Sequence, residues 1–229
     1  MGLELPVRQF IKRNKFISKK NYIVPEKFGK KVVLPRKLTK DLCRIIGILQ
    51  GDGNISNGRI LVVDKSIGFH KVLKSLFKET FNINPNLFHD KKRHTYYSHF
   101  KSKIVYKFLK EMFELEEGRK KNLKVPTRIQ KAPWKYKLHY IGGLFDAEAH
   151  VRKRQAEIDF SISSKNIFDF IQLGLRHIKI KYSTYVRKRR HLPEYEIRIY
   201  GKKNLLTFQE RIKFYHPEKI LMLMKVSTR

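Results

Sequence analysis

The sequence IIGILQGDG at residues 45–53 has a counterpart in IGGLFDAEA at residues 141–149. In each stretch an acidic residue, Asp52 or Glu148, directly follows a small residue and comes five residues after a glycine. A glycine inside a helix costs about 1 kcal/mol relative to alanine, so its repeated occurrence needs a structural reason. Small residues four apart let two helix backbones approach closely. The repeat therefore predicts two helices that pack against each other and bring Asp52 and Glu148 side by side.

The segments that follow these two helices share one order of elements. From Thr39, a good N-cap residue, the pattern predicts helix, hairpin, helix, hairpin and helix, and the order repeats after a linker with Pro126 and Pro133. Asn57-Gly58 is a strong two-residue hairpin turn. Residues 157–162 alternate between apolar and polar side chains, as a half-buried strand does. The sequence therefore predicts an α/β (α+β) protein with two αββαββα halves related by a pseudo-twofold axis.

This organisation divides the chain into three segments. Residues 39–132 form the first half with its linker, and residues 133–229 form the second half. Residues 1–38 differ from both, with eleven Lys or Arg and only two acidic residues. Two hypotheses remain open for this segment: a solvated tail, or a basic arm that lies along DNA phosphates.

Charge and composition narrow the class of partner. Lys and Arg number 52 against 20 acidic residues, a net charge of +32, while hydrophobic residues make up 41% and can form a core. A charge this large opposes compaction unless a polyanion neutralises it. Nucleic acid is the commonest such partner, because each neutralised phosphate releases counterions. An anionic membrane surface is the weaker alternative, since the basic residues are spread over many segments rather than one amphipathic helix.

Several features of the sequence predict where in the cell the protein is found. No apolar run approaches the roughly 18 residues of a membrane span, and residues 1–4 contain no apolar signal core. Cys43 is the only cysteine, which excludes internal disulfides and cysteine-based zinc sites. We therefore expect an intracellular protein, in the cytoplasm of a prokaryote or in an organelle of a eukaryote, that is neither secreted nor bound to a membrane.

The paired acids have an electrostatic consequence. Both lie at a helix C-terminus, where the macrodipole disfavours negative charge, and two adjacent carboxylates also repel each other. A cation would compensate for both effects. Mg²⁺ is suitable, because it takes oxygen ligands and is often held by one or two carboxylates plus phosphate oxygens.

Both repeats resemble the LAGLIDADG motif of homing endonucleases, and the resemblance extends over residues 39–225. Two motifs in one chain are similar to the single-chain, pseudo-symmetric members of that family. The tail at residues 214–219 resembles endonuclease domains found in inteins. The chain begins at Met1 rather than at a splicing nucleophile, and residues 227–229 include no terminal asparagine. We therefore expect a free-standing protein encoded within an intron.

The resemblance implies a site-specific DNA endonuclease, a metal-dependent phosphodiester hydrolase that makes a double-strand break at a long target. The family's metal-binding acid falls on Asp52 and Glu148, with Gly51 and Ala147 beside them in the expected metal site. Two or more Mg²⁺ ions, replaceable by Mn²⁺, would activate water and stabilise the leaving oxygen. Curved antiparallel sheets would form a saddle for double-stranded DNA, which the protein would bind as a monomer.

Further catalytic candidates surround this centre. Lys65 and Lys165, each next to a middle helix, are candidates for stabilising charge, with Gln50 and Asp64 as weaker ones. Phosphate contact or solvation is the plain alternative for these residues. Gln50 also departs from the motif's usual aspartate, and Ala149 from its final glycine, which affects the expected geometry of the helix ends.

The strands are expected to recognise DNA. A two-stranded β-ribbon can enter the major groove, where Arg suits guanine and a carboxylate can accept from cytosine; Glu194 and Glu196 are therefore secondary candidates. Which face of each strand meets DNA depends on register, because a slip by one residue would exchange the faces. The main DNA-binding candidates are Arg59, Lys91, Lys92, Arg93, Arg152, Arg154, Arg187, Lys188, Arg189, Arg190 and Arg198.

Two alternatives keep the same fold. An RNA maturase would assist intron splicing, with intron RNA as its partner and no need for Asp52. A catalytically inactive DNA-binding regulator would be expected to have lost at least one motif acid, whereas both are present. A purely structural basic protein gives no reason for the duplicated helix ends.

Overall fold

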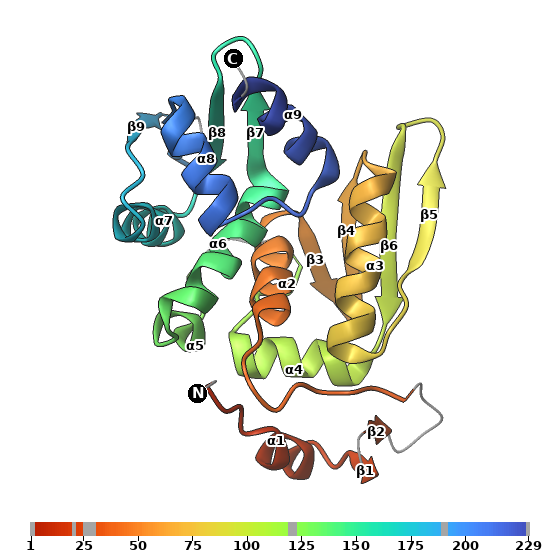
Figure 1. The fold of residues 1–229 in the computed structure, drawn as a ribbon. Coiled ribbons are helices and arrows are strands. Elements are labelled where there is room, and N and C mark those ends of the chain that lie inside the picture. The colour runs from red at the N-terminus through yellow and green to blue at the C-terminus, as the bar shows by residue number, and fades with distance from the viewer. Residues whose placement is uncertain (1–2, 20–21, 25–30, 119–122, 189–191, 228–229) are drawn as a thin grey trace.

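The molecule contains two αββαββα units, with the helices α2 and α6 packed against each other between them (Figure 1). The computed structural model describes the chain except residues 1–2, 20–21, 25–30, 119–122, 189–191 and 228–229. The predicted fold class and the predicted order of elements are confirmed.

The first unit begins at α2 and ends at α4. Its elements are α2 (Lys40–Gly51), β3 (Gly53–Ser56), β4 (Arg59–Asp64), α3 (Ile67–Phe81), β5 (Asn86–Asp90), β6 (Thr95–Lys101) and α4 (Lys103–Phe113). The Thr39 hydroxyl accepts a hydrogen bond from the Leu42 N–H at 3.1 Å, which confirms the predicted start of α2. Asn57 and Gly58 have φ angles of 47° and 77°, as the tight hairpin turn between β3 and β4 requires.

The second unit repeats this order after the short helix α5 (Thr127–Gln130). Its elements are α6 (Trp134–Glu148), β7 (Ala149–Arg152), β8 (Glu157–Ile162), α7 (Lys165–His177), β9 (Tyr182–Arg187), β10 (Glu194–Tyr200) and α8 (Lys202–Arg211), followed by α9 (Pro217–Ser227). The predicted order of elements did not include α9, which has no counterpart in the first unit.

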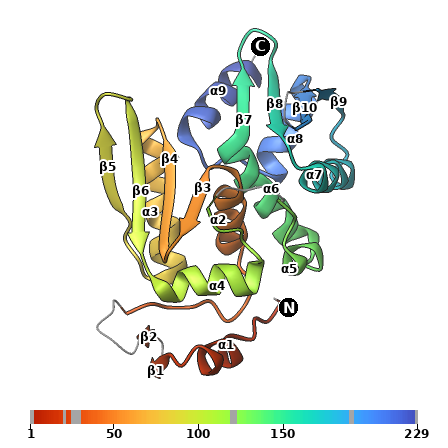
Figure 2. The same cartoon turned by 180° about the vertical axis from the view of Figure 1, so that it is seen from behind.

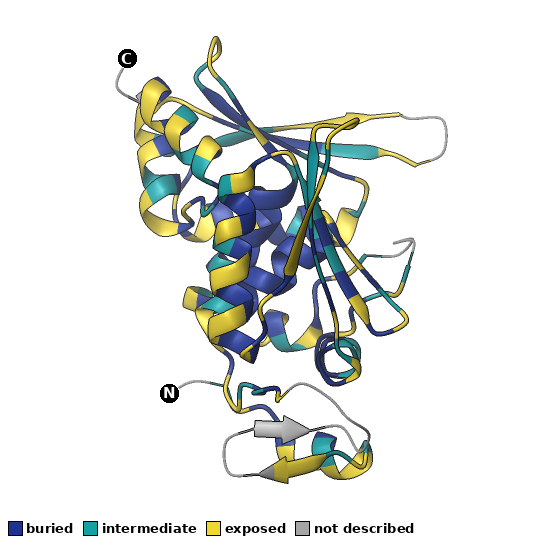
Figure 3. Cartoon of the chain, turned by 90° about the vertical axis from the view of Figure 1, so that its right-hand side faces the viewer, coloured by how far each residue is buried: buried dark blue, intermediate teal, exposed yellow. Residues whose placement is uncertain are grey.

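The two sheets have the same topology. Their strand orders are β3-β4-β6-β5 and β7-β8-β10-β9, and every neighbouring pair is antiparallel. Figure 3 shows most helices on one side of the sheets, where the buried residues gather. No helix within the described residues combines the length and apolar character needed to span a bilayer.

Glycines allow α2 and α6 to touch through their backbones. A Cβ atom on Gly47 would lie 2.2 Å from the Tyr140 carbonyl oxygen, and one on Gly143 would lie 2.2 Å from the Arg44 carbonyl oxygen. Neither obstacle is a flexible side chain that could turn aside. The predicted reason for the paired glycines is therefore confirmed: each helix offers a surface without side chains to the other.

Gly47→Ala and Gly143→Ala are each expected to lower the free energy of unfolding by about 3 kcal/mol, the upper end of the usual cost of overpacking. The cost is high because only a shift of whole helices can make room for the methyl group. Urea unfolding followed by circular dichroism measures the change. Gly68→Ala in α3 is the matched control, since its added Cβ would lie 3.3 Å from the nearest atom, Cγ of Pro217. A Gly47→Ala variant as stable as this control would contradict the close approach of the helices.

The N-terminal segment packs onto α4 rather than extending into solvent. It contains α1 (Val7–Arg13), β1 (Ile17–Lys19) and β2 (Tyr22–Val24). The Phe10 ring is buried and meets the Phe108 ring edge-on, with centroids 5.9 Å apart. Figure 2 shows the segment below α4, at the opposite end of the molecule from α9. The hypothesis of a solvated tail is therefore wrong for the described part, while contact with DNA phosphates stays a prediction.

Candidate active site

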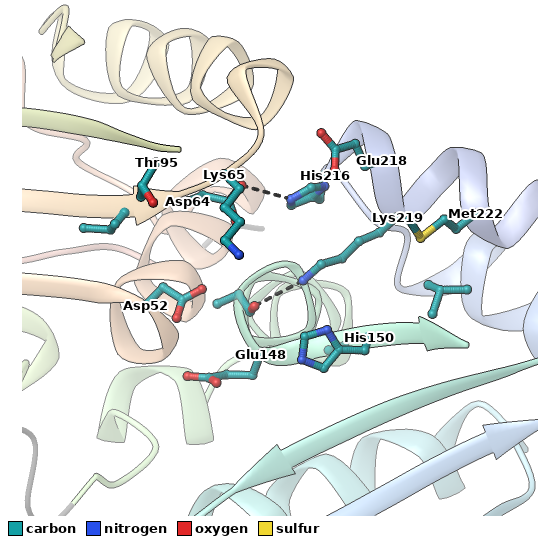
Figure 4. A pocket seen from close by; sticks show the side chains of 14 residues that line it. Asp52, Asp64, Lys65, Thr95, Glu148, His150, His216, Glu218, Lys219 and Met222 are labelled. Carbon is teal, nitrogen blue, oxygen red and sulfur yellow. Dashed lines mark hydrogen bonds and ion pairs between the residues drawn. The ribbon is translucent and has the colours of Figure 1, made fainter. Parts of the chain in front are cut away.

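The C-terminal ends of α2 and α6 bring the two motif acids together. Asp52 is the C-cap residue of α2, and Glu148 is the last residue of α6. A Cβ atom on Gly51 would lie 2.3 Å from Cβ of Ala147 and 3.3 Å from Cγ of Glu148. Figure 4 shows the side chains of Asp52 and Glu148 at the same opening. The predicted proximity of the two helix ends is therefore present in the structure.

Both acids line an open cavity of about 640 Å³. Its walls come from α2, β4, β6, α6, β7 and α9, so both units and the C-terminal helix contribute. The lining residues are Asp52, Val63, Asp64, Lys65, Thr95, Ala147, Glu148, Ala149, His150, Val151, His216, Glu218, Lys219 and Met222. Carboxylates, ammonium groups and imidazoles thus surround a space open to solvent.

Lys219 of α9 closes the end of α6. Its ammonium group is buried and donates to the carbonyl oxygens of Phe145, Asp146 and Ala147, at 3.2 Å from the first and 3.1 Å from the last. The Phe145 oxygen also accepts from the Ala149 N–H at the end of α6, whereas the Asp146 and Ala147 oxygens lie in the last turn, where a helix leaves carbonyl groups without a helical partner. Burial lowers the pKa of Lys219, although four nearby acids, including Asp52 and Glu148, act in the opposite direction. Lys219 therefore holds the helix end that carries Glu148.

A buried ion pair holds the segment before α9. Arg44 and Asp146 are both inaccessible to solvent, and Arg44 Nη1 lies 2.9 Å from Asp146 Oδ2. The other carboxylate oxygen accepts the backbone N–H groups of Tyr215 and His216, at 2.8 and 3.0 Å. The sixth position of the second motif is thus an anchor for the chain that brings His216 and Lys219 to the cavity.

Gln50 occupies the same motif position in the first unit but has a different role. Its carboxamide donates to the Lys124 carbonyl oxygen at 2.9 Å and accepts from the Tyr140 hydroxyl at 2.6 Å. The residue is buried and lies outside the lining of the cavity. Gln50 therefore ties the linker and α6 to α2, and its catalytic role stays a prediction that this position does not support.

Asp64 and His216 form a polar contact across the cavity. His216 Nε2 lies 3.4 Å from Asp64 Oδ1, and the imidazole stacks on the Phe69 ring with centroids 4.7 Å apart. Burial opposes ionisation of Asp64, but hydrogen bonds from His216 and from the Ser66 N–H outweigh it and lower the pKa of this carboxyl. An ionised Asp64 therefore lines the cavity and ties the first unit to α9.

The two candidate lysines are not equivalent in the structure. Lys65 lines the cavity and precedes the N-cap residue of α3, Ser66. Lys165 follows the N-cap residue of α7, Ser164, and forms an exposed ion pair with Asp169 at 2.6 Å, outside the cavity lining. Alignment of the two caps makes Ser163 the counterpart of Lys65. This difference of two residues puts the Lys165 side chain on the helix surface, so its catalytic role stays a prediction that its place in the structure does not support.

The donors present fit a hard divalent cation. Within the described part of the chain, no three His, Cys, Asp or Glu side chains gather into a metal-binding cluster. Two carboxylates are nevertheless sufficient for Mg²⁺ when water and substrate phosphate complete its coordination. The Ala147 carbonyl oxygen already accepts from the Lys219 ammonium, so a second cation on it is disfavoured. The metal site at Asp52, Glu148, Gly51 and Ala147 stays a prediction, with the Ala147 carbonyl oxygen as its least suitable donor.

The register of the strands places the DNA-binding candidates. One face of the second sheet, the one that points away from the helices, carries three arginines. Residues directly opposite each other on neighbouring strands share a face, and the register pairs Arg152 with Glu157, Arg198 with Asp159 and Arg187 with Glu194. Exposed basic side chains at or beside the strand ends are Arg59, Lys91, Lys92, Arg93, Arg154 and Lys188. Arg189 and Arg190 lie outside the described residues.

One predicted feature of β8 is wrong. The strand was expected to be half-buried, with its polar residues on the solvent side. Glu157 and Asp159 are buried as well, because Arg152 and Arg198 lie over them as ion-pair partners. Glu196 of β10 is buried for the same reason, between Arg187 and Arg198.

Sequence reasoning missed the roles of Lys219 and His216. The only available signal was the resemblance of residues 214–219 to endonuclease domains, which assigned no function to either side chain. Their contacts join residues about 70 positions apart, so no local pattern could have predicted them.

Comparison with known proteins supports the same fold. Residues 135–213 match the LAGLIDADG-like domain family. The chain is 28% identical over 187 residues to the probable translation initiation factor IF-2 of Methanocaldococcus jannaschii, covering 78% of this chain and 16% of that protein. It is 27% identical over 205 residues to the glutamine–fructose-6-phosphate aminotransferase of the same organism, covering 87% and 18%. The chain therefore spans less than a fifth of either relative.

Solved structures show the likeness over most of the chain. The homing endonuclease I-DmoI in complex with DNA and Mn has a TM-score of 0.55 at 17% identity, covering 77% of this chain and 98% of that one. I-DmoI with DNA and Ca has a TM-score of 0.57 at 17% identity, covering 81% and 97%. Full-length DUF199/WhiA from Thermatoga maritima has a TM-score of 0.52 at 12% identity, covering 81% and 60%. The predicted resemblance and fold are confirmed; at these identities the structures show the fold alone.

Proposed function

This chain carries a LAGLIDADG-like domain within the fold of the single-chain homing endonuclease I-DmoI, and we propose that it is a site-specific DNA endonuclease. It would make a metal-dependent double-strand break at a long target, acting inside the cell as a monomer on double-stranded DNA. The observation that carries this proposal is the convergence of Asp52 and Glu148, one from each unit, on a single open cavity. A pseudo-symmetric pair of acids is suited to the two antiparallel strands of a duplex.

Asp52 and Glu148 would hold the metal, for which we propose two or more Mg²⁺ ions, with Mn²⁺ able to substitute. I-DmoI has been described with DNA and either Mn or Ca, and a variant of it with Mg. When bound, such ions activate water and stabilise the leaving oxygen of a phosphodiester. The contact between α2 and α6 keeps the two carboxylates together, and Lys219 holds the end of α6. Lys65, at the same cavity, can pair with a phosphate oxygen of the DNA backbone.

The two relatives from Methanocaldococcus jannaschii support the proposal that this chain is a mobile genetic element. Their names describe unrelated activities, translation initiation and an aminotransferase reaction, yet each matches most of this chain over about a sixth of its own length. A segment shared by such different proteins is best explained as a unit that spreads independently of its host gene. We propose that this chain is such a unit, encoded within an intron.

A break-mapping experiment tests the proposal. Purified protein is incubated with fragmented genomic DNA from a relative that lacks the insertion, with Mg²⁺ or with EDTA, and the new ends are sequenced. We expect one recurrent double-strand break that requires Mg²⁺. A break that persists in EDTA would contradict the metal-dependent reaction.

The second candidate function is a DNA-binding regulator without nuclease activity. It is favoured by one observation, the presence of the same fold in DUF199/WhiA, which shows that the architecture is shared by proteins known by another name. Specific binding without any Mg²⁺-dependent break, on DNA that contains the bound sequence, would favour this candidate. The similar structures cited above give no support to intron RNA as a partner.

A further inference from the structure

Alternating charges cross all four strands of the second sheet on the face away from the helices. Arg152 of β7 pairs with Asp159 of β8, and Arg198 of β10 lies 4.0 Å from the same carboxyl group. Arg198 also lies 3.2 Å from Glu196, which accepts from Arg187 of β9 as well. We call these five residues the charge ladder. Each carboxylate therefore holds two arginines from different strands.

The acidic and the basic side chains of the ladder differ in solvent exposure. The side chains of Asp159 and Glu196 are only 7% and 3% exposed, whereas those of Arg152, Arg198 and Arg187 are 40%, 25% and 48% exposed. The carboxylates are therefore covered by their partners, and only the guanidinium groups are presented outward. Glu196 is thus corrected as a candidate for accepting from cytosine, because its oxygens are engaged by arginines.

This arrangement suits base recognition better than phosphate attraction. Attraction to the DNA backbone depends on uncompensated positive charge. The ladder offsets three arginines with two carboxylates, and Glu157 adds a third carboxylate, 3.6 Å from Arg152. A carboxylate also fixes the orientation of a guanidinium group, and the Tyr185 ring lies under Arg198 at 4.6 Å. Oriented N–H donors are what O6 and N7 of guanine require in the major groove. Exposed basic side chains at the described hairpin turns, such as Lys91, Lys92 and Arg154, are better placed to contact phosphates.

The matching face of the first sheet has different chemistry. Val63, Tyr97 and Phe88 lie side by side across β4, β6 and β5, and Leu61 is paired with His99 one step along. Phe88 is 59% exposed, although it is apolar and belongs to a highly charged chain. Arg59 lies at the end of β4 next to the turn. The row of Val63, Tyr97 and Phe88 is therefore apolar and aromatic, and the next row, Leu61, His99 and Asn86, contains no carboxylate or guanidinium group.

We propose that the two sheets read half-sites of different composition: the charge ladder reads guanines, and the apolar face of the first sheet reads thymines. The thymine methyl group is the apolar feature of the major groove, and an apolar side chain contacts it favourably. The inference rests on the proposed function for its partner, double-stranded DNA, but it does not require cleavage. The DNA target expected for this protein is a site with one G·C-rich half and one A·T-rich half.

Selection from a library of duplexes with a randomised core tests this inference. The full-length protein is used with Ca²⁺, and bound DNA is sequenced. We expect a consensus with guanine preferred about tenfold over adenine at the ladder positions, as one well-placed guanidinium contact provides, and T·A pairs in the other half. A consensus of equal composition in both halves, or no consensus, would overturn the inference.

Variants assign each half of the consensus to a sheet. Glu196→Gln removes the carboxylate that Arg187 and Arg198 share, while Arg198 keeps its contact with Asp159. It is therefore expected to weaken the guanine preference in one half while strengthening binding to random DNA at low salt. The salt dependence of that binding should steepen by about one counterion, because one more charge is uncompensated. Phe88→Ser is the matched variant and is expected to weaken only the thymine preference. A variant that merely misfolds would lose both halves together.

The outcomes separate this inference from the proposed function. If the protein selects an asymmetric consensus but does not cut that DNA in the presence of Mg²⁺, the inference about the charge ladder is supported and the proposed endonuclease activity is contradicted. A Mg²⁺-dependent break within a site of uniform composition would support the endonuclease and overturn the ladder.

Discussion

Asp52→Asn and Glu148→Gln are each expected to reduce double-strand cleavage by at least about a hundredfold, while binding to target DNA is retained. Loss of a group that merely supports a metal ligand commonly costs 10- to 100-fold, so loss of the ligand itself should cost more. Both substitutions keep the size of the side chain and remove only its charge. Cleavage is measured on the mapped target with Mg²⁺, and binding by fluorescence anisotropy with Ca²⁺.

Glu218→Gln is the matched control for this pair. Glu218 is an exposed acid at the rim of the same cavity, and it stands outside both motifs. Its neutralisation should change cleavage by only a few-fold. If Asp52→Asn or Glu148→Gln cut as fast as Glu218→Gln, the assignment of the metal-binding acids would be wrong.

Arg44→Met is expected to lower the free energy of unfolding by about 3–5 kcal/mol, the usual cost of removing one partner from a buried ion pair. The loss is large because Asp146 would remain buried with a negative charge and without its guanidinium partner. Arg44 also donates to the Ile212 and Lys213 carbonyl oxygens, and its guanidinium lies 4.0 Å from the centre of the Tyr215 ring. Urea unfolding followed by circular dichroism measures the difference.

The exposed pair of Lys165 and Asp169 provides the comparison. Its side chains are 66% and 48% exposed, and such surface pairs contribute about 0–1 kcal/mol. Lys165→Gln should therefore leave stability almost unchanged. Equal stabilities for Arg44→Met and Lys165→Gln would show that the buried pair does not hold the C-terminal segment to α6.

The sequence alone determined the features that depend on short spacings. The repeated glycine and acid positions predicted the packing of α2 on α6 and the proximity of Asp52 and Glu148. Thr39, Asn57 and Gly58 predicted a helix start and a hairpin turn through backbone geometry that belongs to the residues themselves. Apolar periodicity then predicted the order of helices and strands in both halves. Each of these signals is contained within a few neighbouring residues or in a direct repeat.

Only the tertiary structure decided which distant side chains meet. Lys219 and His216 reach the cavity because the buried carboxylate of Asp146 binds the backbone before α9. Lys165 misses the cavity because a difference of two residues at a helix start changes the face of a side chain. The acids of β8 are buried because arginines on other strands cover them. Such contacts depend on how whole elements pack, and a spacing pattern carries no information about the partner that will fill the space.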